Sequence, residues 1–162
     1  MMKEFLKMAV LTILFLIIIY EIYINTLYNY NYYSSLIEIS IPMFAKMEEK
    51  DTHGGFHGEG EALAKIYFSN EQAEKFLSKI KENKHWSKFP MPENLRHYIH
   101  NCIDKEMEMP IIDNGYWFFL NRYNKIPDKY DYTELERKPS SNFSIAVIDT
   151  DSNMLYIYSL DT

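Results

Sequence analysis

MAVLTILFLIIIY, residues 8–20, contains only apolar residues and one tyrosine, apart from Thr12. The apolar character continues past Glu21 to Ile24, so residues 8–24 would form a helix about 26 Å long at 1.5 Å per residue. A membrane-spanning helix needs roughly 17–25 mainly apolar residues. The segment therefore predicts a membrane-spanning helix, and it decides the fold because everything after it must form a separate domain.

Two other interpretations of this segment stay open, namely a cleaved signal peptide and a buried core helix. Cleavage requires small residues in an Ala-x-Ala-like pattern. No Ala or Gly occurs between Ala9 and Ala45, and the nearest candidates are Thr26, Ser34 and Ser35. Tyrosines crowd the distal end of the segment, where aromatic rings favour the boundary between membrane and water. They are Tyr20, Tyr23, Tyr28, Tyr30, Tyr32 and Tyr33. These features favour an uncleaved signal-anchor.

The lysines predict the orientation of this anchor. Lys3 and Lys7 precede the apolar run, and no Lys or Arg follows before Lys46. Cytoplasmic flanks of membrane helices carry the excess of Lys and Arg. The sequence thus predicts a single-pass protein of the cell membrane with a cytoplasmic N-terminus and a C-terminal domain outside. The lone Cys102 permits no disulfide within the chain.

The charge balance limits the possible partners of the outer domain. Two lysines and two glutamates precede residue 36, so the domain carries the whole net charge of −6. An acidic domain without a basic cluster argues against binding to nucleic acid. Lys outnumbers Arg by 14 to 3, and this bias is typical of AT-rich bacterial genomes. The domain is expected to contact an envelope or extracellular protein instead.

We divide the chain into a membrane anchor at 1–24, an Asn/Tyr-rich linker at 25–35 and an extracytoplasmic domain at 36–162. Alternating apolar residues predict half-buried strands at 36–41 and 62–68. Ser69 and Gln72 form a capping box that begins a helix. The apolar residues of this helix lie on one arc, namely Ala73, Phe76, Leu77 and Ile80.

A second helix is expected to begin near Pro92, with its inward-facing residues at Leu95, Tyr98, Ile99 and Cys102. Three β-rich runs follow, at 116–120, 143–148 and 155–160, and turn residues at 149–153 predict a hairpin between the last two. This order predicts an α+β domain with a mainly antiparallel sheet of about five strands and two helices on one face. The long polar connection at 123–141 is of the kind that is functional or disordered.

The segment 51–61 has an unusual composition, because it contains four of the five glycines of the chain. Its residues Asp51, His53, His57, Glu59 and Glu61 all occupy odd positions, which an extended chain places on one face. A glycine-rich hairpin with solvated side chains is the simplest interpretation. A ligand or partner could also be contacted there. The residues for such a contact would be His53, Gly54, Gly55, His57 and Glu59.

Metal binding is the alternative function for this segment. His53, His57 and Glu59 could hold zinc or another divalent metal, with an open position for water. A spare glutamate could then act as the general base of a metal-dependent hydrolase. The spacing matches no established metal signature, and His97 and His100 are expected on the solvent side of the second helix. The turn at 149–153 lacks the glycine and the distal acid of a calcium loop.

Several stretches resemble a group of small, uncharacterised bacterial proteins with an N-terminal membrane segment. They are residues 51–61, 114–119, 143–149 and 155–162. The resemblance covers part of the outer domain and implies a location and an architecture, but no activity. No complete catalytic constellation is visible in the chain. The sequence therefore favours a non-enzymatic, membrane-anchored binding or interaction domain.

Overall fold

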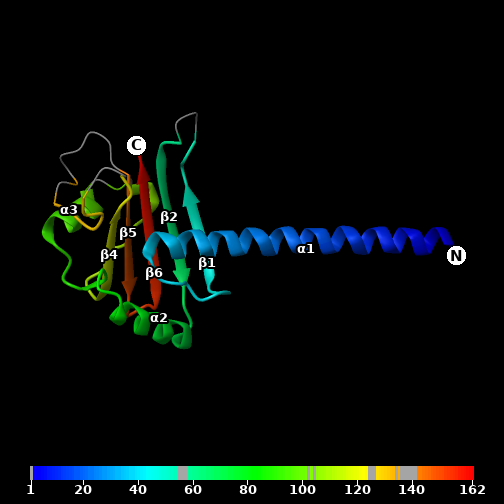
Figure 1. Cartoon of the computed structure of the whole chain (residues 1–162), viewed down its shortest axis with the longest axis horizontal. Helices are drawn as coiled ribbons and strands as arrows, with labels where there is room; N and C mark the ends of the chain where they lie inside the picture. The colour runs from blue at the N-terminus through cyan, green and yellow to red at the C-terminus, as the bar shows by residue number, and fades with distance from the viewer. Residues whose placement is uncertain are drawn as a thin grey trace.

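The computed structural model describes residues 2–54, 58–101, 103, 105–123, 127–133, 135 and 142–162. One long helix precedes a six-stranded antiparallel sheet with two further helices, which confirms the α+β prediction with six strands rather than five (Figure 1). The elements are α1 (Met2–Ile37), β1 (Lys46–Asp51), β2 (Gly60–Tyr67), α2 (Asn70–Glu82), β3 (Ser87–Lys88), α3 (Glu93–Asn101), the 3₁₀ turn η1 (Lys105–Met107), β4 (Gly115–Asn121), β5 (Phe143–Asp149) and β6 (Met154–Asp161).

The strands lie in the order β1-β2-β6-β5-β4-β3, and every neighbouring pair is antiparallel. The predicted strands at 62–68, 116–120, 143–148 and 155–160 correspond to β2, β4, β5 and β6. The turn between β5 and β6 is confirmed as well, since Asp149 Oδ1 accepts a hydrogen bond from the Asp151 amide at 2.9 Å. The highly charged β1 and the two-residue β3 form the edges of the sheet, where charge and short length discourage pairing with other chains.

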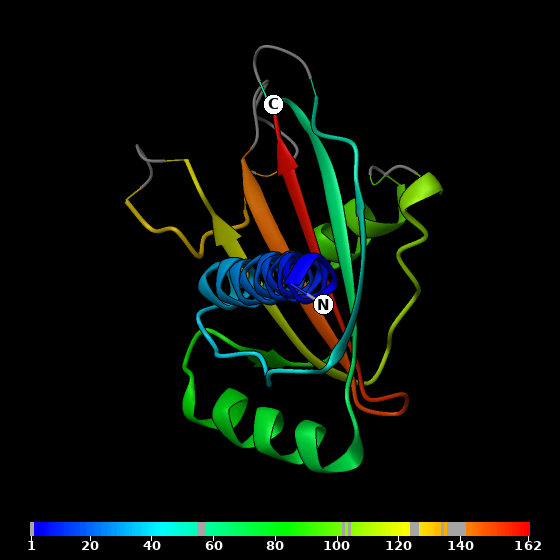
Figure 2. The same cartoon turned by 90° about the vertical axis from the view of Figure 1, so that its right-hand side faces the viewer.

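The helices cover both faces of the sheet, so the prediction that two helices share one face is wrong. Phe76 of α2 packs with Ile66 and Phe118 on one face, and the end of α1 lies on the same side. Leu95 of α3 packs with Phe119 on the other face (Figure 2). The physical reason is that the central strands are buried on both sides, as the pattern of β5 shows, and each apolar face needs a cover.

The two short helices begin as the sequence predicts. The Ser69 hydroxyl accepts a hydrogen bond from the Gln72 amide at 3.3 Å, and the Gln72 side chain accepts one from the Ser69 amide at 2.9 Å. This capping box satisfies two backbone donors that the first turn of α2 would otherwise leave unpaired. Leu95 and Ile99 are buried on α3, and Tyr98 packs against the same cluster.

Helix α1 consists of an exposed part and an embedded part. Leu6–Ile37 is long and apolar enough to cross a membrane, and its most apolar stretch has no covered side chains. The embedded part packs against the sheet through Tyr30, Tyr33 and Ile37. The helix is therefore continuous from the predicted anchor into the core of the domain (Figures 1 and 2).

This continuity corrects two predictions. The proposed linker at 25–35 is helical, and the strand predicted at 36–41 is wrong because the helix ends at Ile37 and a turn follows. Ile37, Ile39 and Ile41 are all buried. Ile37 ends the helix and Ile39 and Ile41 follow it, so their burial produces an alternating pattern although no strand forms. The first strand of the chain is β1.

The end of α1 is fixed to the domain by polar contacts. The indole N–H of Trp86 donates to the Ile37 carbonyl at 3.1 Å. Next to it, the Glu38 carboxylate accepts hydrogen bonds from Lys129 at 2.5 Å and from the Tyr130 hydroxyl at 2.9 Å. Burial opposes ionisation of Glu38, but the hydrogen bonds from Lys129 and Tyr130 outweigh it, so the pKa of Glu38 lies below its usual range.

Replacing Glu38 with glutamine should weaken this junction at neutral pH and have less effect in acid. A lowered folded-state pKa stabilises the fold above the unfolded pKa, near 4.5, and this stabilisation is lost as the pH falls through the folded value. Urea unfolding of the full chain in detergent at pH 7 and at pH 3 measures the difference. Glu74→Gln on the exposed side of α2 is the matched control and should change little at either pH. An equal loss in the free energy of unfolding for Glu38→Gln at both pH values would contradict a stabilising role of the ionised Glu38 carboxylate.

Candidate functional site

The glycine-rich segment forms the connection of the β1–β2 hairpin. Asp51 pairs with Ala62, and β2 begins at Gly60, inside the segment. The Thr52 amide continues the ladder by donating to the Glu61 carbonyl at 2.8 Å, and the Glu61 amide donates to the Thr52 hydroxyl at 2.9 Å. The prediction of a glycine-rich hairpin is confirmed, but the expectation that its side chains are solvated is wrong for His53, whose ring contacts two carboxylates and is only 22% exposed.

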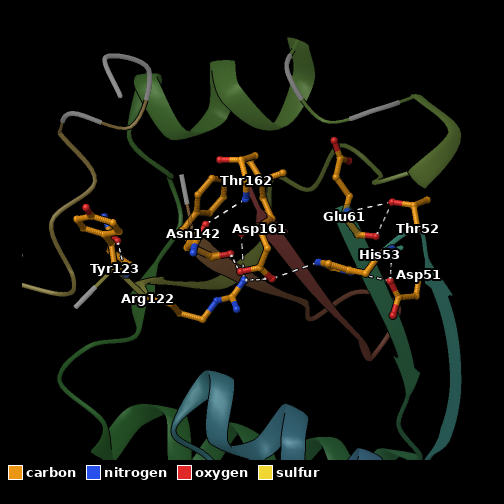
Figure 3. Close-up of polar contacts among 12 residues, drawn as sticks. Asp51, Thr52, His53, Glu61, Arg122, Tyr123, Asn142, Asp161 and Thr162 are labelled. Carbon is orange, nitrogen blue, oxygen red and sulfur yellow. Dashed lines mark hydrogen bonds and ion pairs between the residues drawn. The ribbon is translucent and has the colours of Figure 1, made fainter. Parts of the chain in front are cut away.

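The imidazole of His53 lies between two carboxylates (Figure 3). Its Nδ1 is 2.6 Å from Oδ1 of Asp51, and its Nε2 is 3.1 Å from Oδ2 of Asp161 at the end of β6. The backbone amide of His53 also donates to Oδ1 of Asp51 at 2.7 Å. The side chain connects the hairpin to the last strand of the sheet, because its two ring nitrogens contact residues 110 positions apart in the chain.

Arg122, immediately after β4, completes what we call the His53 network, which consists of Asp51, His53, Arg122 and Asp161. One terminal nitrogen of Arg122 donates to Oδ2 of Asp161 at 3.0 Å and to the carbonyls of Leu160 at 3.1 Å and Phe143 at 3.2 Å. The side chains of Arg122, His53 and Asp161 are 21%, 22% and 26% exposed. They are therefore partly shielded from water, and the charge of Arg122 offsets that of Asp161.

Two glycines permit this geometry. A Cβ at Gly60 would lie 2.5 Å from the Cα of His53 and 2.7 Å from its amide nitrogen, so only glycine allows the two segments to lie together. Gly58 has a φ of +67°, a conformation that glycine adopts without strain. The unusual glycine content of the segment thus has a structural cause at these two positions.

The network lies on the face of the sheet that α1 covers. Asp51 alternates along β1 with Glu49, which accepts a hydrogen bond from the Tyr33 hydroxyl of α1 at 2.5 Å. Burial opposes ionisation of Asp51, but the hydrogen bonds from the amide and the ring of His53 outweigh it and lower the pKa of Asp51. Asp51 is therefore ionised at neutral pH, and the network is a charged patch beside the embedded end of α1.

Of the two predicted metal ligands that the structure describes, His53 and Glu59, only His53 belongs to the network. Both ring nitrogens of His53 contact carboxylates, which leaves neither free for a metal in this arrangement. Glu59 is exposed, whereas His57 and Gly55 lie outside the described residues. Within the described ranges, no group of three His, Cys, Asp or Glu side chains could hold a metal ion. The predicted zinc or divalent-metal site stays a prediction.

The remaining candidates do not belong to the His53 network. Gly54 is exposed, and its amide donates to the Glu59 carbonyl at 3.4 Å. On α3, Nδ1 of His97 contacts the Asn101 amide group at 3.0 Å, and His100 is exposed as expected. Cys102 lies outside the described residues. The long connection after β4 is described at 127–133 and at Leu135, which is buried.

Sequence reasoning did not identify Arg122 and Asp161 as site residues. They lie 39 positions apart and meet only because β4, β5 and β6 are neighbours in the sheet. A weak signal was present in β6, where Leu155 and Ile157 are followed at the same spacing by Ser159 and Asp161. A change from apolar to polar residues along one face of a strand indicates that this end of the face is not part of the apolar core.

No family model matches the chain, and no curated protein or solved structure is significantly similar to it. The resemblance to small bacterial membrane proteins therefore stays a prediction. The structure itself defines the molecule as an α+β domain that is continuous with one long apolar helix.

Removal of the Asp161 carboxylate should loosen the hairpin. Asp161→Ala leaves Arg122 and His53 without their common partner, and we expect a loss of about 1–2 kcal/mol in the free energy of unfolding for these partly exposed groups. Urea unfolding of the full chain in detergent measures the loss. Asp113→Ala, at an exposed position before β4, is the control and should stay within about 0.5 kcal/mol. Equal effects of the two substitutions would contradict the role of Asp161.

Proposed function

We propose that this chain is a single-pass membrane protein whose folded domain lies outside the cytoplasm and binds an envelope or extracellular protein. The observation that carries the anchoring is the uncovered first part of α1. Its large apolar side chains are 40–67% exposed from Leu6 to Ile24. Transfer of so many Leu, Ile, Val and Phe side chains from water into lipid is favourable by on the order of 20 kcal/mol.

The division within α1 supports the same conclusion. A soluble protein that used α1 as a core helix would bury its apolar residues, but burial begins only at Tyr30 among the larger side chains. The whole helix of 36 residues is about 54 Å long, whereas the hydrocarbon core of a bilayer is about 30 Å thick. The helix is long enough to cross the bilayer and to enter the domain without a break.

The distribution of positive charge supports the orientation. Lys3 and Lys7 lie on the N-terminal side of the apolar run, and the next cation is Lys46, at the start of β1. Short flanks with Lys and Arg stay in the cytoplasm. We therefore infer that the sheet and helices α2 and α3 lie on the outer side of the membrane.

Protease treatment of intact cells tests this topology. A full-length chain with a C-terminal epitope tag should remain in the membrane pellet after alkaline extraction and should lose the tag to external protease. An N-terminal tag is the matched control and should be degraded only after the cells are permeabilised. A protected C-terminal tag would overturn the orientation, and a fully extractable chain would overturn the anchor.

The hairpin connection is the surface that we assign to the protein partner. The His53 network holds its base in one arrangement, and a preordered loop loses less conformational entropy on binding. Gly54, Gly58 and Glu59 are exposed there, so the backbone is open to a partner. The acidic charge of the domain favours a partner with a basic surface.

Photo-crosslinking in the native membrane tests the binding surface. A photoreactive phenylalanine derivative at Glu59 of the full chain should yield a discrete adduct after illumination. The same derivative at Asp113, which is also exposed, is the control and should yield none. Identical products at both positions, or none at Glu59, would contradict a partner at the hairpin.

A further inference from the structure

We propose that the turn at residues 42–45 is a second membrane contact, which inserts Met43 and Phe44 into the interfacial region of the lipid bilayer beside α1. The inference rests on the proposed anchoring of α1. It adds a lipid-binding element of the domain itself, which would fix how the domain is oriented on the membrane.

The turn exposes two large apolar side chains at its tip. Phe44 is 79% exposed and Met43 is 55% exposed, although neither belongs to the apolar part of α1. Phe44 has the largest exposed fraction among the large apolar side chains of the described residues. Single exposed apolar residues are common on proteins. This pair differs from them in how its backbone is held and in where it lies.

The backbone of the turn is strained at its exposed phenylalanine. The Ala45 amide donates to the Pro42 carbonyl at 3.4 Å, which closes a four-residue turn with Met43 and Phe44 at its centre. Phe44 has a φ of +65°. Glycine or asparagine is favoured at such a position, and another residue there costs on the order of 1 kcal/mol or more. A strained, exposed phenylalanine indicates a role outside the core of the domain.

The turn is also braced from two sides. The Tyr30 hydroxyl of α1 donates to the Ala45 carbonyl, and the Gln72 side chain of α2 donates to the Met43 carbonyl at 3.5 Å. The tip is therefore attached to α1 at the level of Tyr30. Figure 1 shows the connection between α1 and β1, in cyan, projecting from the domain toward the N-terminal part of α1.

This position matches the interfacial layer of a membrane. Tyr30 follows Ile24, the last residue of the predicted span, by six residues, which is about 9 Å along the helix. The polar region outside the hydrocarbon core is about 5–7 Å thick on each side. A turn that projects back from Tyr30 along α1 reaches this layer, where aromatic side chains are favoured.

Lipid quenching of a tryptophan introduced at the tip tests the inference. Full-length Phe44→Trp is reconstituted in vesicles of phosphatidylethanolamine and phosphatidylglycerol, with either plain or brominated acyl chains. Trp86 and Trp117 are buried, so the parent chain provides their background emission. We expect the added emission of Phe44→Trp to be lost in brominated vesicles and to be protected from acrylamide in the aqueous phase.

Two reference variants distinguish failure of this inference from failure of the anchor. Phe15→Trp reports the anchor and should be quenched by brominated lipid, whereas Ile111→Trp, at an exposed position before β4, should be quenched only by acrylamide. If Phe15→Trp is quenched by lipid and Phe44→Trp behaves like Ile111→Trp, the membrane contact of the turn is overturned and the anchor stands. If Phe15→Trp also escapes lipid quenching, both proposals are overturned.

Discussion

Replacing both Leu14 and Ile17 with arginine is expected to release the chain from the membrane. Both side chains are 51% exposed and lie near the middle of the predicted span. On the insertion scale, an exchange of an apolar residue for arginine at the centre of a helix costs about 3 kcal/mol, so the pair costs about 6 kcal/mol. Alkaline extraction of membranes should move the variant from the pellet to the supernatant or to aggregates.

The control for this prediction is the Leu14→Ala/Ile17→Ala variant, which keeps the segment apolar and should remain in the pellet. The exposed part of α1 does not support the domain, so the arginine variant should keep a folded sheet in detergent. Membrane retention of the arginine variant would contradict a spanning segment at 8–24.

Trp86→Ala is expected to have the largest effect on folding of the domain. Trp86 is 6% exposed, its ring stacks on Phe118 with centroids 5.5 Å apart, and it contacts Phe76 edge-on at 6.1 Å. Its N–H also holds the Ile37 carbonyl at the end of α1. Truncation of such a residue costs about 3–5 kcal/mol. Urea unfolding of the full chain in detergent, followed by circular dichroism, measures the change.

Trp86→Phe separates packing from the hydrogen bond. Phenylalanine keeps most of the ring contacts and removes the N–H donor, so the loss should be about 1–2 kcal/mol. A cost below about 1 kcal/mol for Trp86→Ala would contradict the account in which this residue joins α1 to the sheet.

The strands of the sheet interior could be predicted because their apolar runs are bounded by turn residues. Residues 143–148 and 155–160 differ from β5 and β6 by two residues at most. The capping box at Ser69 likewise predicted the start of α2. In these elements local sequence and tertiary packing favour the same structure, and this agreement makes a pattern informative.

The edges of the sheet and the end of α1 could not be predicted in the same way. β1, with the sequence KMEEKD, has almost no apolar pattern and becomes a strand by pairing with β2. Residues 25–35 contain asparagines that favour turns, yet Tyr30 and Tyr33 are spaced as one face of a helix and pack on the sheet. Here tertiary burial outweighed the local propensity.

Only the part of the candidate site that lies within one continuous stretch of sequence could be predicted. The glycines and His53 lie within one segment, whose unusual composition is visible in the sequence. The order of the strands brings Asp161 to His53 and Arg122 to Asp161, and no short sequence pattern contains that order. The prediction that both helices lie on one face is wrong for a similar reason. The apolar pattern of a helix shows that one side is buried, but it does not show which face of the sheet that side covers.

A scan of nitroxide spin labels along α1 tests most directly whether the helix passes from the bilayer into the domain. Single cysteines at 8–37 of full-length Cys102→Ser are labelled in vesicles, and relaxation by oxygen and by a water-soluble nickel chelate is compared. We predict that oxygen, which dissolves in lipid, dominates at every position from 8 to 24. From 28 to 37, the access of both reagents to the spin label should oscillate with a period of about 3.6 residues and be lowest at Tyr30, Tyr33 and Ile37. Access of the nickel chelate throughout 8–24, or no oscillation beyond 28, would contradict a continuous helix that anchors the domain.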